Sequence, residues 1–212
     1  MISRNNEPDY LPALLPDGRV IFTRWEYTDK EQKRAQSLWT MNPDGTGIQV
    51  FWGNQSVWPD ILAEPRPIPG SGKIMFTGVG HHRWFEGSIG IIDPFKGMNY
   101  PGGLSKVTAE IAWPEVGNGP LERTEADNYR PGQYKAYKTP YPIGQEDVLV
   151  SIKRSGTGTF SLYLMDLAGN RELIYSGEHN VWHAMPIRPR RKPSIIPDRI
   201  KWPKIGSNQE PL

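Results

Sequence analysis

The four histidines are the side chains of this 212-residue sequence best suited to binding a metal ion or a cofactor. His81 and His82 are adjacent, and adjacent side chains of a strand point to opposite faces, so the pair is not expected to hold one ion. His179 and His183 share one face, but four residues of extended chain separate them by about 13 Å. The sequence therefore predicts no metal site. One of the adjacent histidines can still contact a partner, so both are candidate binding residues.

Motifs for nucleophilic or phosphate chemistry are absent. Neither G-x-S-x-G nor H-E-x-x-H occurs. The PGSGKI stretch at Pro69–Ile74 lacks the Walker pattern, which requires Gly where Pro67 stands and Ser or Thr where Ile74 stands. Zero cysteines exclude disulfides, Cys-based zinc sites and haem attached through C-x-x-C-H within this chain. We expect no catalytic activity and no cofactor in this chain alone.

Aromatic residues in predicted loops are the better candidates for recognition. Trp25 and Tyr27 follow one predicted strand, and Trp84 and Phe85 follow another just beyond His81 and His82. Loops on a rigid scaffold are common binding sites, and aromatic side chains are enriched in interfaces. Packing within the fold explains exposed-looking aromatics as well, so both interpretations stay open. The predicted ligand is a protein partner or a flanking domain of the same protein.

Composition favours many short strands joined by tight turns. The chain has 22 glycines and 21 prolines, about a fifth of its residues, together with eight Trp, nine Tyr and six Phe. A net charge of +2 predicts no nucleic-acid partner, and no apolar stretch approaches the roughly 20 residues that would insert in a membrane. The first ten residues lack the apolar core of a secretory signal. Localisation stays open, with the periplasm expected if the chain belongs to a longer secreted protein.

The elements that would position these residues repeat along the chain. A turn followed by an apolar strand occurs at Pro16–Thr23, Gly70–Thr77 and Gly144–Ser151. In each copy a polar or glycine-bearing turn precedes β-branched or apolar residues. Internal repeats of this kind define the architecture of a chain with many short strands.

A second motif follows the first each time. It reads SLWTMNPDGTG at Ser37–Gly47, SIGIIDPFKGM at Ser88–Met98 and SLYLMDLAGNR at Ser161–Arg171. An Asx residue that bonds its own backbone and a later glycine are typical of a turn that folds the next strand back. A tryptophan follows each copy, at Trp58, Trp113 and Trp182, so the order of motifs is the same three times.

These repeats predict an all-β partial propeller of about three four-stranded antiparallel blades within 7–187. The expected blades are approximately 10–60, 61–115 and 138–187, with a loop-rich insertion at approximately 99–137. A β-sandwich is the alternative fold. Since propellers have 4–8 blades, three require a longer protein, self-association or neighbouring subunits to complete the ring.

The last segment, 188–212, is predicted to be an extended basic, proline-rich linker or tail. Residues 188–204 contain seven Lys or Arg and one acid, Asp198. Prolines keep such a segment extended, and its charge could also hold an anionic partner.

The repeat around LWTMNPDGTG resembles the TolB-like, or PD40, class of WD40-like propeller repeats. YLPALLPDGRVIFTRWEY, QSLWTMNPDGTG, RPIPGSGKIMFTGVGHH and GSIGIIDPFKG together resemble the middle domain of hydrazine synthase alpha subunits, over roughly residues 7–193. The resemblance implies a bacterial multidomain protein in which a propeller lies between two other domains. Covalent haems of that family need C-x-x-C-H motifs, so any haem would lie in flanking domains outside this chain.

Two functions follow as expectations. The first is a non-catalytic propeller that scaffolds adjacent domains or binds a protein partner, the chain being a fragment of a longer protein. The alternative is the middle domain of a hydrazine-synthase-like multihaem oxidoreductase subunit. The propeller gate of a serine peptidase is a third possibility, and it would need a G-x-S-x-G motif outside this chain.

Overall fold

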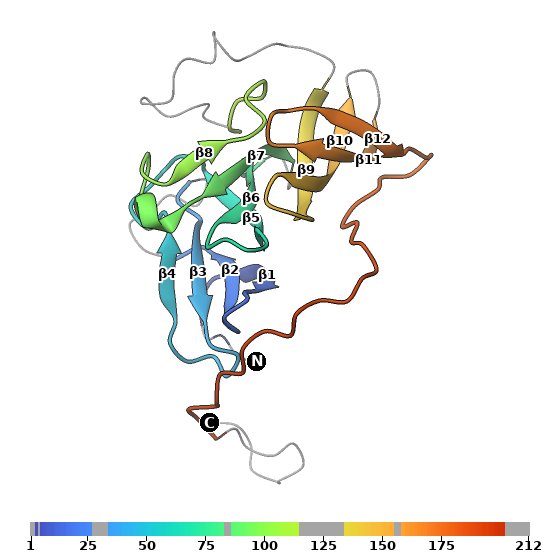
Figure 1. Cartoon of the computed structure of the whole chain (residues 1–212). Coiled ribbons are helices and arrows are strands. Elements are labelled where there is room, and N and C mark those ends of the chain that lie inside the picture. Colours follow the sequence, from blue (N-terminus) through green and yellow to red (C-terminus); the bar gives the residue numbers. More distant parts are fainter. Residues whose placement is uncertain are drawn as a thin grey trace.

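The computed structural model describes residues 3, 5–26, 34–82, 86–114, 134–154 and 158–201. Within these residues the chain is all-β, with twelve strands in antiparallel ladders and one short 3-10 turn at Pro94–Lys96 (Figure 1). The predicted all-β class is confirmed. No helix among the described residues is long and apolar enough to cross a membrane.

The strands form three consecutive antiparallel meanders of four strands each. The first meander comprises β1 (Asp9–Leu14), β2 (Val20–Arg24), β3 (Ser37–Met41) and β4 (Gln49–Trp52). The second comprises β5 (Ile61–Pro67), β6 (Ile74–Val79), β7 (Gly87–Ile92) and β8 (Leu104–Lys106). The third comprises β9 (Tyr134–Pro142), β10 (Asp147–Arg154), β11 (Phe160–Asp166) and β12 (Arg171–Tyr175).

One pair of residues, Gly87 and Tyr137, joins β7 of the second meander to β9 of the third. This single contact makes those two meanders one continuous eight-stranded sheet, while the first meander is a sheet of its own. Two strands fall within the segment 99–137 that the sequence assigned to an insertion, namely β8 and the start of β9. The stretch 115–133 between them lies outside the described residues.

The repeated Asx–Gly motif forms the turn between the third and fourth strands of each meander. At β3–β4 the Gly45 N–H donates to the Asn42 carbonyl, and Gly45 has φ of 81°. At β11–β12 the Asp166 carboxylate accepts the Asn170 N–H at 2.9 Å, and Gly169 has φ of 91°. Positive φ values are accessible to glycine without steric cost, which is why these turns close at glycine.

The meanders pack face on face through two separate cores. The first core joins the first and second meanders and includes Ile21, Leu38, Trp52, Leu62, Ile74, Phe76, Ile92 and Trp113. The second joins the second and third meanders and includes Met75, Ile89, Ile91, Tyr137, Val148, Val150, Ile152, Tyr163 and Met165. Because successive side chains of a strand point to opposite faces, β6 contributes Phe76 to one core and Met75 to the other. The middle meander is therefore buried on both faces.

Trp113 fills the first core where two glycines make room for it. Its ring stacks on Phe76 with centroids 5.8 Å apart. A Cβ atom at Gly78 would lie 2.4 Å from the Trp113 ring, and one at Gly90 would lie 2.8 Å from it. The small residues of β6 and β7 are thus required by the tryptophan that covers them.

Residues 188–201 form an extended segment that returns from the third meander to the first (Figure 1). The Ser194 N–H donates to the Pro16 carbonyl at 3.3 Å, and the Arg199 N–H donates to Asp44 Oδ2 at 2.6 Å. The Thr46 hydroxyl, followed by the Arg199 N–H, lowers the pKa of Asp44 to about 2. This part of the predicted tail is therefore bonded to two turns of the first meander.

Candidate functional site

The first strand of each meander contains a bulge at an equivalent place. Leu11, Glu64 and Thr139 have φ values of 53°, 54° and 50°, and each is followed by proline. The pairing of the first strand with the second shifts register at each of these positions. Positive φ is uncommon for residues other than glycine, so three equivalent cases point to a shared structural requirement.

His183 has the same backbone conformation, with φ of 55°, although it lies beyond the last strand. The Ser151 hydroxyl donates to the Val181 carbonyl at 2.6 Å, just as the Thr23 hydroxyl donates to the Leu62 carbonyl at 2.6 Å. Val181 thus occupies the place of Leu62, two residues before the bulge. The segment 181–185 continues the series of bulged first strands.

This equivalence changes the alignment of the third repeated tryptophan. The motif order matches Trp182 with Trp58 and Trp113, whereas the backbone places Trp182 at the position of Ala63, directly before the bulge. Trp113 lies buried in the first core, while Trp182 is 47% exposed. The sequence match was misleading because the segment between Tyr175 and Val181 is shorter than its counterparts in the other repeats.

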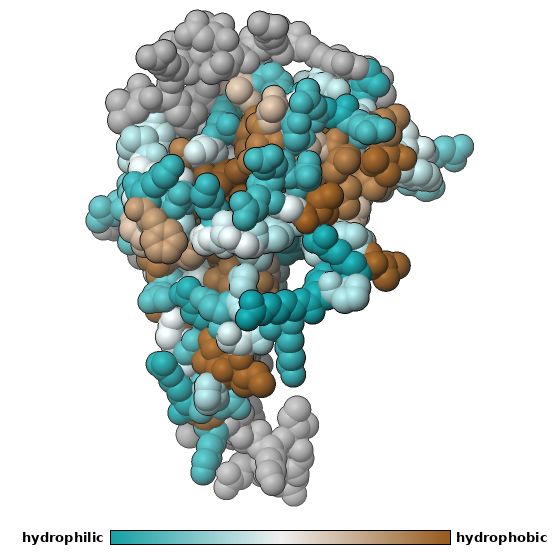
Figure 2. All heavy atoms as spheres, viewed as in Figure 1, coloured by the Kyte–Doolittle hydropathy of each residue, from teal (hydrophilic) through white to brown (hydrophobic). Residues whose placement is uncertain are grey.

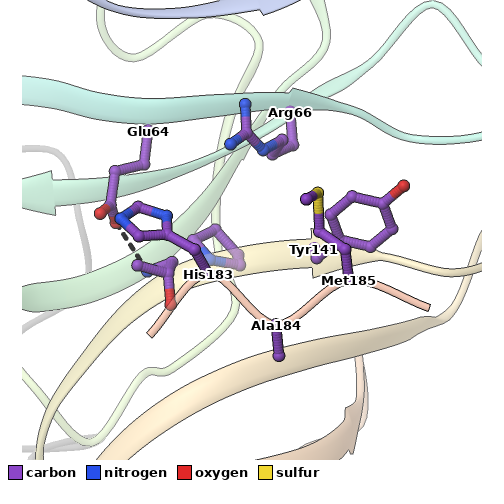
Figure 3. Close-up of a pocket in the computed structure, with 8 residues that line it drawn as sticks. Glu64, Arg66, Tyr141, His183, Ala184 and Met185 are labelled. Carbon is purple, nitrogen blue, oxygen red and sulfur yellow. Dashed lines mark hydrogen bonds between the residues drawn. The ribbon is translucent and has the colours of Figure 1, made fainter. Parts of the chain in front are cut away.

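The bulged strands lie side by side and enclose a pocket of about 120 Å³. β1 packs beside β5, and β5 packs beside β9. Three successive bulges line the pocket, and Figure 3 shows their side chains around one space. The lining residues are Glu64, Arg66, Thr139, Pro140, Tyr141, His183, Ala184 and Met185.

Glu64 is the most constrained polar residue of the pocket. Its Oε2 accepts the Thr77 hydroxyl at 2.9 Å and the Thr139 N–H at 2.6 Å, the latter drawn as a dashed line in Figure 3. The side chain is buried, at 5% exposure. A buried carboxylate that accepts two hydrogen bonds is held in one orientation, so Glu64 joins the second meander to the third.

Lys138, directly before the bulge of β9, is nearly buried, at 6% exposure. Its Nζ lies 3.9 Å from the centroid of the Trp182 ring and 5.7 Å from that of Phe160. Burial lowers the pKa of Lys138, and the negative charge of Glu64 opposes that effect. Ring faces and a carboxylate together make a buried ammonium group tolerable.

Arg66 and His183 add basic side chains to the pocket. Among the described residues Arg66 donates one long contact of 3.5 Å, to the Pro65 carbonyl, and it lines the pocket. His183 is exposed, and Met185 and Tyr141 add an apolar side. Within the described part of the chain no three His, Asp or Glu side chains gather as metal ligands.

The residues that the sequence singled out for binding lie elsewhere. His81 and His82 follow β6, their rings meet edge to face with centroids 5.0 Å apart, and neither lines the pocket. Trp25 follows β2, and its carbonyl accepts the Asn5 side-chain amide at 2.9 Å. Tyr27, Trp84 and Phe85 fall outside the described residues. The role of all six in binding stays a prediction.

Sequence reasoning missed the pocket, although a signal was present. Each of the first three bulges reads as a residue followed by proline, at Leu11–Pro12, Glu64–Pro65 and Thr139–Pro140. A proline inside a strand typically marks a bulge or an edge. The repeated motifs begin one strand later, at the turn before β2, and so do not include the strand that lines the pocket.

Comparison with solved structures finds a protein of similar fold. Kuenenia stuttgartiensis hydrazine synthase matches 84% of this chain with a TM-score of 0.56 and 18% sequence identity. No family model matches the sequence, and no curated protein matches it. At this identity the likeness concerns the fold alone. The chain therefore has a fold related to part of hydrazine synthase, and it spans 21% of the length of the chain that it matches.

Proposed function

We propose that this chain is part of a β-propeller and acts as a non-catalytic scaffold within a longer, multidomain bacterial protein. In this proposal the three meanders are blades, and the bulged first strands lie nearest the ring axis. The carrying observation is that β1, β5 and β9 lie side by side with equivalent bulges.

Face-to-face packing supports the radial arrangement. A meander inside a propeller has neighbours on both faces, and the second meander contributes side chains to both cores. A two-layer sandwich would bury only one face of each sheet. The likeness to part of hydrazine synthase supports a place in a longer polypeptide.

The side chains favour a supporting role. Glu64 in the pocket and Lys138, directly before the bulge of β9, are both buried and are occupied by hydrogen bonds and ring contacts. Loops such as the one carrying His81 and His82 would then contact flanking domains or a protein partner, with Trp25 near a second loop. Binding at these loops is part of the proposal.

Crosslinking of the full-length natural product tests the scaffold. Lys73, Lys96 and Lys135 are reactive groups in turns and strand ends of the second and third meanders. If the chain holds flanking domains, an amine crosslinker should join at least one of these lysines to a residue outside 1–212. Crosslinks confined to residues within 1–212 would contradict the proposal.

A second candidate function is the middle domain of a hydrazine-synthase-like multihaem oxidoreductase, which the structural likeness favours. Any covalent haem would be attached outside this chain, since the chain has no cysteine. Two observations test this alternative: C-x-x-C-H motifs in the flanking reading frame, and the haem absorption spectrum of the full-length product. A product without covalent haem would exclude it and leave the scaffold.

A further inference from the structure

Residues 181–187 lack regular strand pairing, yet they repeat the geometry of a first strand. We propose that they are the first strand of a fourth four-stranded unit, and that three later strands of the same polypeptide pair with them and cover the outer face of the third meander. The inference rests on the proposed propeller. It assigns residues 181–187 and the adjacent face of the third meander as the surface on which the next unit packs.

Two backbone contacts place 181–187 in register with β5. The Leu62 N–H donates to the Gln36 carbonyl at 3.1 Å, and the Val181 N–H donates to the Phe160 carbonyl at 2.9 Å. Gln36 and Phe160 are equivalent because each directly precedes the Ser-Leu pair that begins the repeated third-strand motif. Together with the equivalent Thr23 and Ser151 hydroxyl bonds, these contacts attach Leu62 and Val181 to the preceding meander in the same way.

The sequence after the bulge agrees with this register. Pro67–Ile68 follows the bulge of β5, Pro142–Ile143 follows that of β9, and Pro186–Ile187 follows His183 at the same spacing. Four segments thus share one backbone conformation and one Pro–Ile or apolar continuation. Chance similarity of a linker does not explain contacts, dihedral angles and sequence together.

The face of the third meander that points away from the second meander, here called its outer face, carries the apolar residues expected of a buried face. In the second meander the equivalent face presents Met75, Ile89 and Ile91, which the third meander buries to 8% exposure or less. The repeat places Leu149, Leu162 and Leu164 at those positions, and these are only partly buried. Figure 2 shows apolar side chains gathered over β10–β12.

Exposed apolar side chains surround this face. Leu173, Ile174 and Tyr175 of β12 are 49%, 52% and 57% exposed, and Met185 is 55% exposed. The last strand of the first meander, by contrast, ends in Trp52, which is fully buried. Large apolar patches on a protein surface usually mark an interaction site. Because each earlier meander is covered by the next one, the partner expected here is another meander.

The occupant is a three-stranded meander and not a second copy of this chain. A second copy would bring its own β1 to the place where 181–187 already lies. The free face of the first meander in that copy is also closed, since Phe22 is 1% exposed beneath Arg24. Arg24 forms one ion pair with Asp9 through two hydrogen bonds of 2.7 and 2.8 Å. In each meander of this chain all four strands follow one another, so the missing three are assigned to the same polypeptide.

The test supplies the missing strands from the chain's own repeat. A copy of residues 70–106, which carries the turn and strands β6–β8, is appended to Leu212, so that 188–212 serves as the linker. The matched control carries Ser in the appended copy at the positions of Ile74, Phe76 and Ile92, which enter the first core. Hydrogen exchange, including that of the Trp182 indole N–H followed by NMR, is then compared in both proteins.

If the proposal holds, amide exchange in 181–187 and β12 slows at least tenfold in the extended chain relative to the control. The Trp182 indole N–H also exchanges more slowly as the ring loses contact with water. Equal exchange rates in the two proteins would overturn the proposal.

Sedimentation equilibrium of residues 1–212 tests whether a second copy of the chain covers this face instead. The chain should stay monomeric over the concentration range used, whereas a dimer in which Trp182 becomes protected would refute the assignment to the same polypeptide. The result of this test is independent of the crosslinking test of the scaffold. The appended strands can dock on the third meander even if the chain forms no crosslinks to flanking domains.

Discussion

The Glu64 carboxylate accepts the backbone N–H of Thr139 at 2.6 Å, across 75 residues of sequence and between two bulges. Both residues have positive φ and both belong to first strands. Without this bond the Thr139 N–H, which the bulge removes from the sheet ladder, would be left unpaired. The side chain of one bulge therefore satisfies the backbone of the next.

Replacing Glu64 with alanine should destabilise the chain by about 1–3 kcal/mol, because two buried donors lose their acceptor. Glu64→Gln retains an acceptor oxygen and should cost less. Urea unfolding followed by fluorescence measures both, with Glu172→Ala on the exposed strand β12 as a control expected to change little. Equal losses in the Ala and Gln variants would show that the hydrogen bonds are not responsible.

The pKa of Lys138 should respond to the same residue. Burial lowers this pKa and Glu64 raises it, so Glu64→Gln should lower it further. An NMR titration that follows the Lys138 side chain in both proteins measures the difference. An unchanged or higher pKa in the variant would mean that the two charges do not interact as their positions indicate.

Gly90→Ala should destabilise the first core by about 1–3 kcal/mol through overpacking. The new Cβ atom would lie 2.7 Å from carbons of the Phe76 ring and 2.8 Å from the Trp113 ring. Gly158→Ala is the control, since no atom lies within 4 Å of the added carbon there. Thermal unfolding of the two variants should separate them, and a Gly90→Ala protein as stable as the control would refute the packing of Trp113.

Ser151→Ala should release residues 181–187 and leave the ladder of β9–β11 in place, although the Thr139 hydroxyl also loses its bond to Ser151. The serine hydroxyl donates to the Val181 carbonyl, and a bond of this kind contributes about 0.5–1.5 kcal/mol. Hydrogen exchange should therefore accelerate at 181–187 while β9–β11 remain protected. Ser105→Ala, at an exposed position of β8, serves as the control. Uniform acceleration in all strands would instead indicate a general loss of stability.

Asp44→Asn should reduce stability at neutral pH and lose its effect in acid. The pKa of Asp44 is lowered from 3.8 to about 2, so the folded state favours the charged form. Stability from this group is complete above about pH 4 and is lost as pH falls through about 2. The difference in unfolding free energy between wild type and Asp44→Asn, measured at pH 7 and pH 2.5, should shrink in acid. A difference that does not vary with pH would contradict the assigned cause.

Much of the fold follows from local patterns that the sequence displays. Alternation in Ser37–Met41 and Phe160–Asp166 predicts strands, and Asn42 with Gly45 predicts the turn, because strand period and turn chemistry depend on neighbouring residues. The all-β class and the order of strands in each repeat follow in the same way. The blade boundaries and the loop residues proposed for binding remain predictions.

The sequence by itself determined where the chain turns and which side chains alternate in each strand. Only the tertiary structure decided which faces meet, since Met75 and Phe76 are equally apolar in sequence but enter different cores. It also brought Glu64, Thr139 and His183 to one pocket. A residue followed by proline marks the bulges at Glu64 and Thr139 locally, but which bulges meet depends on the packing of successive meanders, which sums many weak contacts over long sequence separations.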